Sequence, residues 1–413
     1  MNPFLSLKHH YAVPDYPAIE LRAFTHGLMP RSVPAMMQRF TEDWQQQGVD
    51  AWNHIPNHWK PDSDEKVGWW NLPEYLADTF IAPMLGAPAG SCILLPNVHA
   101  AITGLMSCSQ LFLHKKTVVV PADAFPSVLY PVHQWQQLYG LRLHIVPPDV
   151  YGFCNRKAIL DAIDTDTALV FLSHVGFTSG EVLTDDFVTS VAAKVHLAGG
   201  LLVVDGYHAT GSVPTAVQET KADVYVGGLL KEASGSAGNG YLYIRPGLDL
   251  RPTTAGWFAD AAPFAFNLKP TWHPEVRRRF LGGTTAVAPL YHAVEGLKIL
   301  LEAGIDRVRA HTLALTAHAI DHIQALPITL RSPVTPEKRG PMLILEMPHA
   351  DYMCHHLKAH HIFTDSRKGN LLRLAPFVWN SQTEIDQTFR LIGDALKSNS
   401  YLHTSFTSEG PVT

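Results

Sequence analysis

Short, continuously apolar runs alternate with helical patterns through the middle of the chain. The runs cover residues 117–121, 141–146, 168–173, 200–205, 223–228 and 240–244. Because a strand that is buried on both faces is apolar throughout, this alternation predicts an α/β fold with a mostly parallel sheet between layers of helices. In such sheets, ligands bind beyond the carboxyl ends of the strands.

The last quarter of the chain has a different pattern. Residues 342–347 and 370–376 are typical of short strands, and residues 381–396 of a helix. Ser381 and Glu384 have the spacing of a capping box at the start of this helix, whose apolar face is formed by Ile385, Phe389, Ile392 and Leu396. The pattern predicts a smaller α+β domain.

These patterns divide the 413 residues into four parts. They are an N-terminal segment (1–70) expected to pack on the small domain, a large sheet domain (71–290), the small α+β domain (291–397) and a loose polar tail (398–413). Helices are predicted from about Ser32 to Gln47 and from near Asn71 and Pro73.

Composition indicates a soluble enzyme-sized protein rather than a binder of polyanions. The chain is 46% hydrophobic and 17% charged, with a formal net charge of -5 and mixed signs throughout. No basic face predicts nucleic acid or an anionic membrane as partner, and no run approaches membrane-spanning length, so we expect a small-molecule substrate. Four scattered cysteines without a CxxC pair, and an N-terminus without a secretory leader pattern, favour the cytoplasm.

Two histidine-rich stretches, residues 318–322 ("HAIDH") and 355–361 ("HHLKAHH"), can each place two imidazoles one helical turn apart. Metal ligands sometimes have this spacing. No carboxylate or cysteine stands in a recognisable ligand spacing with either pair, so solvated helix faces are the preferred interpretation and no metal is expected.

Lys231 ends the apolar run 224–230 and precedes a stretch of mostly small residues, 233–239. A lysine at a strand end is usually a snorkelling surface residue. These flanks favour instead a tight, partly dry pocket that lowers the pKa of the amine and favours a Schiff base. The small residues are expected to let the backbone approach a bulky ligand.

Asp205 ends the strand 200–205. It is expected at the same sheet edge as Lys231, because the separation of 26 residues between them is long enough for one helix and one strand to return the chain to that edge. It is either a local helix cap or a carboxylate facing a ligand. An aspartate on a pyridinium nitrogen, with a lysine Schiff base across the ring, is the arrangement that serves pyridoxal phosphate. A helix beginning at a possible N-cap, Asn97, offers free N–H groups for a phosphate.

The chain resembles, over nearly its whole length, the pyridoxal-phosphate enzymes of the aminotransferase class V group (fold type I), and most closely the kynureninases. The segments that carry the resemblance occur in the family's order: 26–32 ("HGLMPRS"), 125–127 ("FPS"), 173–182 ("SHVGFTSGEV"), 203–214 ("VVDGYHATGSVP"), the Lys231 segment, 256–258 ("GWF"), 280–285 ("FLGGTT") and 366–376 ("SRKGNLLRLAP"). The resemblance implies a seven-stranded-type, mostly parallel sheet in a large domain that binds pyridoxal 5'-phosphate.

The resemblance also implies roles for individual residues. Lys231 would bind the cofactor covalently, Asp205 would pair with the pyridine nitrogen, and His208 would lie beside the cofactor. The remaining implied contacts are stacking by Phe125, phosphate binding at the helix start by Asn97, Val98 and His99, closure of the cofactor site by Trp257 and Thr284, and a grip on the substrate α-carboxylate by Arg373. Core packing is the alternative for both aromatic residues, and an exposed edge-strand position for the arginine.

Several positions depart from the kynureninase pattern. Leu230 stands where kynureninases carry a tyrosine, Val128 replaces the aspartate of "FPSD", and Ala259 and Asp260 replace an expected "GH". These departures leave three hypotheses open. The first is kynureninase-like hydrolytic cleavage of a Cβ–Cγ bond. The second is β-elimination, transamination or decarboxylation of a different amino acid in a biosynthetic pathway. A cysteine desulfurase is disfavoured, because no cysteine lies in an obvious loop near the "GNLLRLAP" segment and Cys354 is expected in a helix. The third is a non-catalytic, cofactor-binding regulator.

The resemblance further implies a homodimer, in which part of the Trp257 or Thr284 region comes from the partner chain. The loops 51–60 and 68–70, which are rich in tryptophan and histidine, favour either an aromatic substrate or ordinary core packing.

Overall fold

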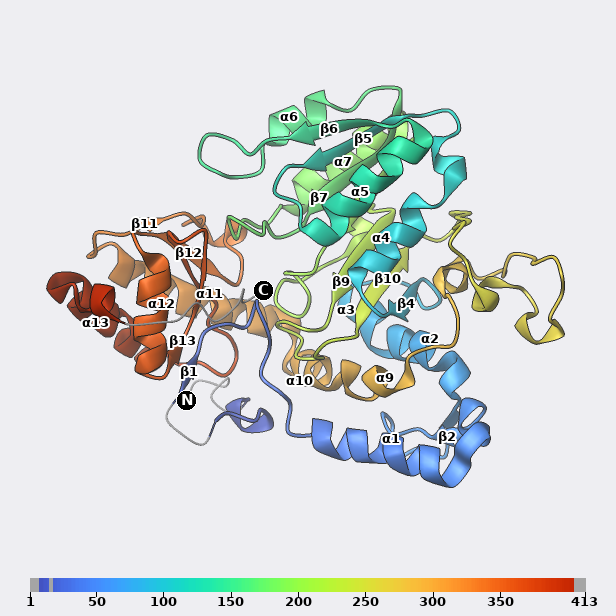
Figure 1. The fold of residues 1–413 in the computed structure, drawn as a ribbon, viewed down its shortest axis with the longest axis horizontal. Coiled ribbons are helices and arrows are strands. Elements are labelled where there is room, and N and C mark those ends of the chain that lie inside the picture. Colours follow the sequence, from blue (N-terminus) through green and yellow to red (C-terminus); the bar gives the residue numbers. More distant parts are fainter. Residues whose placement is uncertain (1–6, 15–17, 405–413) are drawn as a thin grey trace.

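The computed structural model describes residues 7–14 and 18–404, which form two lobes (Figure 1). The large lobe holds a seven-stranded sheet and the small lobe a four-stranded sheet. Helices α10 (Glu295–Ala303) and α11 (Ile305–Ile323) lead from the large lobe to the small one. The fold is therefore α/β with a smaller α+β part, as the apolar pattern predicts.

The seven-stranded sheet has the order β4-β10-β9-β8-β7-β5-β6. Only β10 runs antiparallel to its neighbours, and the pairs from β9 to β6 are parallel. The strands are β4 (Cys92–Leu95), β5 (Thr117–Pro121), β6 (Arg142–Val146), β7 (Thr167–Ser173), β8 (Leu201–Asp205), β9 (Val224–Gly228) and β10 (Gly240–Ile244). The mostly parallel sheet is confirmed, and all six apolar runs that predict strands form them.

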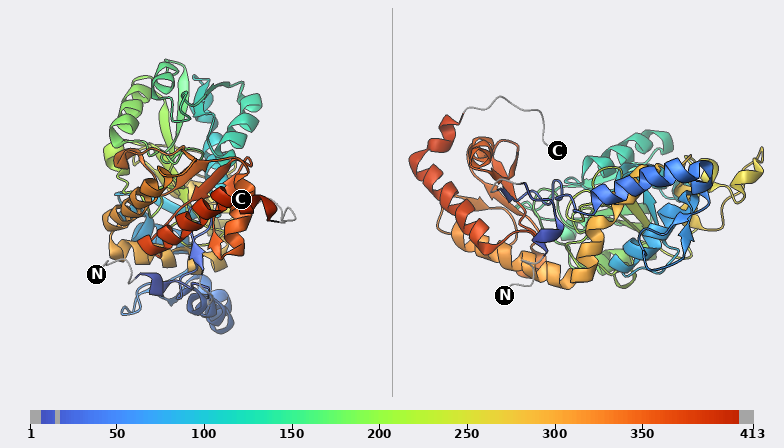
Figure 2. Two further views of the ribbon diagram at one scale, coloured as in Figure 1. Left: turned by 90° about the vertical axis from the view of Figure 1, so that its left-hand side faces the viewer. Right: turned by 90° about the horizontal axis from the view of Figure 1, so that it is seen from below.

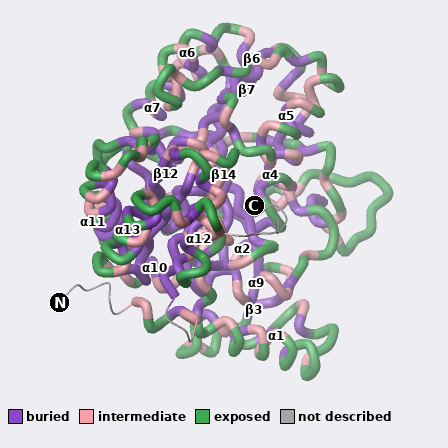
Figure 3. The backbone as a smooth tube through the Cα atoms, turned by 60° about the vertical axis from the view of Figure 1, so that its left-hand side comes forward, coloured by how far each residue is buried: buried purple, intermediate pink, exposed green. Residues whose placement is uncertain are grey.

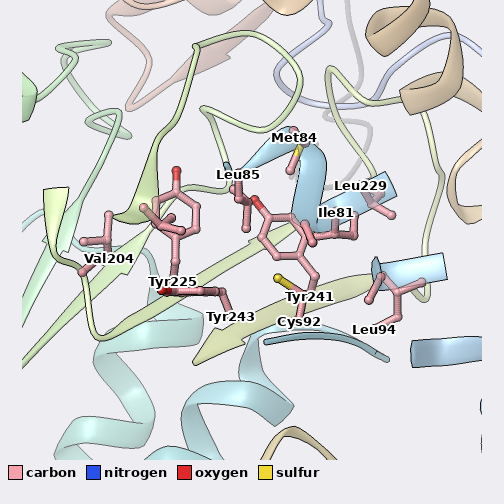
Figure 4. Packing of buried hydrophobic residues seen from close by; sticks show 14 of the residues in the cluster. Ile81, Met84, Leu85, Cys92, Leu94, Val204, Tyr225, Leu229, Tyr241 and Tyr243 are labelled. Carbon is pink, nitrogen blue, oxygen red and sulfur yellow. The ribbon is translucent and has the colours of Figure 1, made fainter. Parts of the chain in front are cut away.

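Helices cover both faces of this sheet, which explains why its inner strands are almost entirely buried, whereas the edge strand β6 is largely exposed. Alternate residues of one strand enter different cores: Leu202 and Val204 of β8 pack on one face and Val203 on the other. Figure 4 shows Tyr225, Tyr241 and other residues of the first of these cores. The remaining helices of the large lobe are α2 (Leu72–Leu76), α3 (Ala82–Met84), α4 (Val98–Met106), α5 (Pro126–Tyr139), α6 (Arg156–Asp161), α7 (Asp185–Leu197), α8 (Val217–Thr220) and α9 (Val287–Ala293).

The small lobe packs three helices on an antiparallel sheet of order β11-β12-β15-β14. Its elements, besides α11, are β11 (Thr329–Leu330), β12 (Leu343–Glu346), β14 (Asp365–Arg367), β15 (Leu371–Leu374), α12 (Ala350–Ala359) and α13 (Gln382–Ser398). The predicted capping box is present: the Ser381 hydroxyl accepts the N–H of Glu384, whose carboxylate accepts the N–H of Ser381. Both strands and the helix predicted for this lobe are formed.

The N-terminal segment, expected as one unit on the small domain, is divided between the lobes. Strand β1 (Ile19–Glu20) pairs with β13 (Ile362–Phe363) of the small lobe. Helix α1 (Val33–Gln47) and the short hairpin of β2 (Ile55–Pro56) and β3 (Lys66–Val67) follow along the large lobe (Figure 2, right). Tyr291 of α9 holds α1 there, because its hydroxyl donates to Asp43 at 2.5 Å and accepts from Trp69 at 2.9 Å.

The beginning of the tail expected to be loose is packed. A 3₁₀ turn spans Ser400–His403, and Tyr401 is buried in the core of the small lobe. Residues 405–413 lie outside the described residues. Figure 3 shows buried residues concentrated inside the molecule and exposed residues around its outline. No helix within residues 7–14 and 18–404 is long and apolar enough to span a membrane.

Candidate active site

A cavity of about 360 Å³ lies at the carboxyl edge of the seven-stranded sheet. Residues at or after the ends of β4, β5, β7, β8 and β9 line it, together with Phe24 and Thr25 of the N-terminal segment and Arg367 and Arg373 of the small lobe. The cavity therefore lies between the lobes, at the edge where ligands of parallel sheets bind.

Lys231 enters this cavity from the loop after β9. Its Nζ lies 3.0 Å from Nε2 of His208, 4.8 Å from the centre of the Tyr207 ring and 5.7 Å from that of Phe125. Burial lowers the pKa of Lys231 to about 8. The amine is therefore not a snorkelling surface group, and a fraction of it is unprotonated and nucleophilic near neutral pH.

The small residues after Lys231 pack against the protein rather than against the cavity. A Cβ on Gly235 would lie 2.1 Å from the carbonyl oxygen of Ala293, and one on Gly27 would lie 2.1 Å from that of Lys231. Ser234 adopts a left-handed conformation with φ of 52°. The small residues thus allow close backbone packing on α9 and on the N-terminal segment, which fixes the direction of Lys231. The role expected from the sequence was different, namely to let the backbone approach a bulky ligand.

Asp205 ends β8 opposite Ser173 of β7 and also lines the cavity. One carboxylate oxygen accepts the N–H of Tyr207 at 2.9 Å. This contact stabilises a turn, since residues 207–212 form turns and no helix that Asp205 could cap. Burial raises the pKa of Asp205 to about 6, and the charge of Lys231 opposes that rise. A cationic partner in the cavity would keep this carboxylate ionised.

His208 is buried beside Lys231, and its Nδ1 has no hydrogen-bond partner among the described residues. Burial, together with the charges of Lys231 and Arg373, holds the pKa of His208 well below its usual range. The imidazole is therefore neutral. A buried ring nitrogen without a partner indicates a place for a ligand atom.

Glu232 follows the lysine and has no counterpart among the sequence-predicted residues. It is fully buried, and neither carboxylate oxygen has a partner among the described residues. Burial raises the pKa of Glu232 to about 8. An acidic residue inside an otherwise apolar and small stretch is the sequence signal that could have identified it.

The start of α4 borders the cavity. The side-chain oxygen of Asn97 accepts the N–H of Ala100 at 2.8 Å, so Asn97 is the N-cap. Asn97 and Val98 line the cavity, as does Ser127 in the first turn of α5. Free N–H groups at a helix start suit an anionic group such as a phosphate.

Three predicted site residues lie elsewhere within the single chain. His99 and Thr284 line a second cavity of about 390 Å³ beside α4. Thr284 belongs to the part of its wall formed by residues 279–286. The Trp257 ring packs against Trp70 and Phe264, at 5.7 and 5.5 Å between ring centres, as in the core-packing alternative. The chain brings together the other seven predicted residues, which are Lys231, Asp205, His208, Phe125, Asn97, Val98 and Arg373.

Arg373 lies on β15, an inner strand of the small-lobe sheet, and is 2% exposed, so it is not an exposed edge residue. Its guanidinium donates two hydrogen bonds of 2.6 Å to Asp365 and lies 4.2 Å from the centre of the Phe24 ring. Arg367 pairs with the same carboxylate at 3.3 Å. Two guanidinium groups share one carboxylate, so this wall of the cavity carries a net positive charge that suits an anion.

Aromatic rings form much of the remaining wall. Phe24, Phe125, Phe177 and Tyr207 all line the cavity, and only Phe125 is among the predicted residues. Phe177 and Tyr207 stand in the quoted motifs "SHVGFTSGEV" and "VVDGYHATGSVP" without a predicted role. An apolar, aromatic cavity with a few charged groups suits a flat ligand.

The tryptophan-rich loops proposed as pocket walls contribute to the core instead. Trp59 and Trp69 are buried in the core beside α9, and the Trp59 ring lies 5.3 Å from that of Tyr291. Neither loop lines the Lys231 cavity in the single chain. Core packing is therefore the interpretation that the structure supports for both rings.

Comparisons with known proteins agree with this geometry. The aminotransferase class-V family matches residues 82–368. The chain is 25% identical to the kynureninase of Burkholderia pseudomallei (strain K96243), over 100% of this chain and 97% of that protein. It is also 25% identical to the kynureninase of Geobacillus thermodenitrificans (strain NG80-2), over 91% of this chain and 87% of that protein. A cysteine desulfurase structure from Thermococcus onnurineus NA1 superposes with a TM-score of 0.77 at 19% identity, covering 92% of this chain and 95% of that one, and shares the fold.

Proposed function

Because the chain belongs to the aminotransferase class-V family and is a pyridoxal-phosphate-dependent enzyme, we propose that it cleaves the Cβ–Cγ bond of an aromatic amino acid hydrolytically. Kynurenine and 3-hydroxykynurenine are the proposed substrates. Full-length similarity to kynureninases supports this assignment. The observation that carries it is a single cavity holding the Lys231 amine, the Asp205 carboxylate and the Arg373 guanidinium.

The residues of the cavity fit pyridoxal 5'-phosphate. The Lys231 amine can bind an aldehyde, and the buried Asp205 carboxylate can pair with a protonated pyridine nitrogen. The unpartnered Nδ1 of His208 can contact a polar substituent of the ring. The start of α4 at Asn97 and Val98 would hold the phosphate. Bound there, the cofactor would withdraw electrons from the substrate α-carbon.

Lys231 is the group placed to move a proton at that carbon. Burial lowers the pKa of its amine to about 8, so Nζ can accept and return a proton near neutral pH. His208 Nε2, 3.0 Å from Nζ, orients the amine by accepting a hydrogen bond from it. Neutral His208 adds no charge that would oppose protonation of Lys231.

Arg373 and Arg367 are the proposed binding groups for the substrate α-carboxylate. Their guanidinium groups share Asp365, which leaves one positive charge for a ligand. The rings of Phe24 and Phe177 flank Arg373 at 4.2 and 5.5 Å and leave an apolar surface for an aromatic side chain. Carboxylate recognition on one side and apolar contact on the other would orient an aromatic amino acid.

A second candidate keeps the cofactor but acts on a different amino acid and at a different bond. Leu230, which lines the cavity, brings no hydroxyl to the place where kynureninases carry tyrosine, and Val128 is buried in the core. Both departures favour β-elimination, transamination or decarboxylation. Persulfide chemistry is not supported, because no cysteine in the described part of the chain lines the Lys231 cavity.

The proposed enzyme is a homodimer in the cytoplasm. Phe264, Phe266 and Leu268 are exposed by 54, 74 and 101% on a segment that projects from the large lobe (Figure 1, yellow). Exposed apolar side chains of this kind indicate an association surface. A second copy would bring Trp257 or Thr284 to the Lys231 cavity of its partner. Mixing inactive Lys231→Ala and Thr284→Ala chains would then restore activity, since each mixed dimer has one intact site.

Product analysis tests the reaction. The cofactor-loaded protein is incubated separately with kynurenine and with 3-hydroxykynurenine, and alanine and the matching anthranilate are quantified. The proposal expects equal amounts of both products and none from Lys231→Ala. A substrate that is consumed without anthranilate would overturn hydrolytic cleavage in favour of the second candidate.

A further inference from the structure

Two histidines of α11 converge on one carboxylate of α13, in the small lobe and outside the active site. Nε2 of His318 and Nε2 of His322 lie 2.7 and 2.8 Å from the same oxygen, Oδ1 of Asp386. The sequence predicts no metal here, because no carboxylate stands in a recognisable ligand spacing with the histidines of "HAIDH". The fold supplies one from 64 residues beyond His322, on the neighbouring helix.

The geometry is that of a partly assembled cation site. The three ligand atoms all lie within 4.8 Å of one another. Around Zn²⁺, with bonds of about 2.0–2.1 Å, neighbouring tetrahedral ligands are about 3.3 Å apart. Each imidazole nitrogen lies about half an ångström closer to the carboxylate oxygen than this spacing, so both rings would have to move outward to admit the ion. Both rings already aim at one oxygen.

The surroundings restrict one ring and leave solvent access. His322 stacks on Phe389 of α13, with 5.5 Å between ring centres and 3° between planes. The side chains of His318, His322 and Asp386 are exposed by 29, 35 and 51%, so water can complete the coordination shell. Two imidazoles and a carboxylate are ligands that Zn²⁺ accepts.

We propose that His318, His322 and Asp386 bind a divalent transition-metal ion, for which Zn²⁺ is the probe, and that the ion links α11 to α13. On binding, the metal replaces the Nε2 protons that the two imidazoles otherwise share with Asp386. Without metal, the same groups form hydrogen bonds between the helices, which is the competing account. The proposal is independent of the reaction in the active site.

The chain offers a matched control on α12. His356 and His360 are also one turn apart, with 4.7 Å between ring centres. Nδ1 of His356 contacts Thr404, and Nδ1 of His360 contacts the carbonyl oxygen of His356. In the described part of the chain, only the group of His318, His322 and Asp386 brings three such ligand atoms together. Changing the α12 pair therefore tests whether any two histidines one helical turn apart bind the metal without a third ligand.

The experiment titrates tag-free, metal-free, cofactor-loaded protein with Zn²⁺ by calorimetry, and elemental analysis after dialysis confirms the stoichiometry. The expected result is one Zn²⁺ per chain at this site. His322→Ala and Asp386→Ala should each weaken binding at least about tenfold, because loss of a ligand costs at least as much as loss of a supporting group. His356→Ala with His360→Ala should leave it unchanged.

Asp386→Asn separates metal binding from simple hydrogen bonding, because asparagine still accepts hydrogen bonds from the imidazoles but is a poorer ligand. The proposal expects Zn²⁺ to raise the melting temperature of the unmodified protein and not that of Asp386→Asn. Absence of Zn²⁺ binding, or binding that survives Asp386→Ala and His322→Ala, would overturn it. Circular dichroism establishes that each variant is folded before titration.

Discussion

The depressed pKa of Lys231 predicts how fast the protein attaches its cofactor at each pH. Burial lowers this pKa from 10.5 to about 8, and the carboxylate of Glu232 acts in the opposite direction. Only the unprotonated amine attacks an aldehyde. The attachment rate should therefore rise with pH and level off above about 8, rather than continue to rise toward 10.5.

The magnitude follows from the two pKa values. At a pH of about 7.5, an amine with a pKa of about 8 is about 24% unprotonated, and one with a pKa of 10.5 is about 0.1% unprotonated. Lys231 should thus present about 240 times more reactive amine than an exposed lysine at that pH. A difference of this size is large against the scatter of a kinetic measurement.

The assay mixes cofactor-free protein with pyridoxal 5'-phosphate in a stopped-flow instrument across the pH range and follows the absorbance of the attached cofactor. Parallel reactions with a free lysine derivative correct for titration of the cofactor itself. Glu232→Gln should move the midpoint to lower pH, because it removes the negative charge that raises the pKa of Lys231. A midpoint near 10 in the unmodified protein would refute the argument that burial activates this amine.

Three substitutions test other parts of the account. Arg373→Lys should raise KM for an amino-acid substrate at least about tenfold with a smaller change in kcat, because lysine cannot form the two-pronged contact with a carboxylate. Tyr291→Phe should lower the free energy of unfolding, measured by urea denaturation, by about 1–3 kcal/mol, because the buried carboxylate of Asp43 loses a donor. Gly206→Ala should yield little folded protein in expression trials, because its Cβ would lie 1.9 Å from the hydroxyl oxygen of Tyr225.

Each of these expectations has a contrary outcome. An unchanged KM in Arg373→Lys would remove the guanidinium from substrate binding. Equal stability of Tyr291→Phe and the unmodified protein would mean that the contact does not hold α1 on the large lobe. A stable, cofactor-binding Gly206→Ala protein would show that the strand end at Asp205 tolerates a shift of Tyr225.

The sheet and its ligand-binding edge follow from the sequence because they depend on local, repeated signals. Apolar runs mark the strands, and the carboxyl ends of parallel strands meet at one edge, so Lys231 and Asp205 could be placed together without coordinates. The Ser381 capping box is equally local. In each case, residues close in sequence determine the structure.

Contacts between distant segments were not predictable in the same way. Phe24 reaches the cavity from the N-terminal segment, and Arg367 from a short strand of the small lobe. Phe24 has no periodic or motif signal that points to the sheet edge, and Arg367 stands in the motif "SRKGNLLRLAP" without a predicted role. Asp386 likewise meets His318 only because α11 and α13 pack side by side. His99 and Thr284 line a different cavity of the same chain, and the predicted role of Thr284 depends on the proposed second copy.

The most direct test of the central claim is to find where the cofactor is attached. The cofactor-loaded protein is reduced with borohydride, digested, and its peptides are sequenced by mass spectrometry. The account predicts one phosphopyridoxyl group per chain, on Nζ of Lys231, and no modified peptide from Lys231→Ala. A group attached to any other lysine, or a protein that takes up no cofactor while correctly folded, would contradict it.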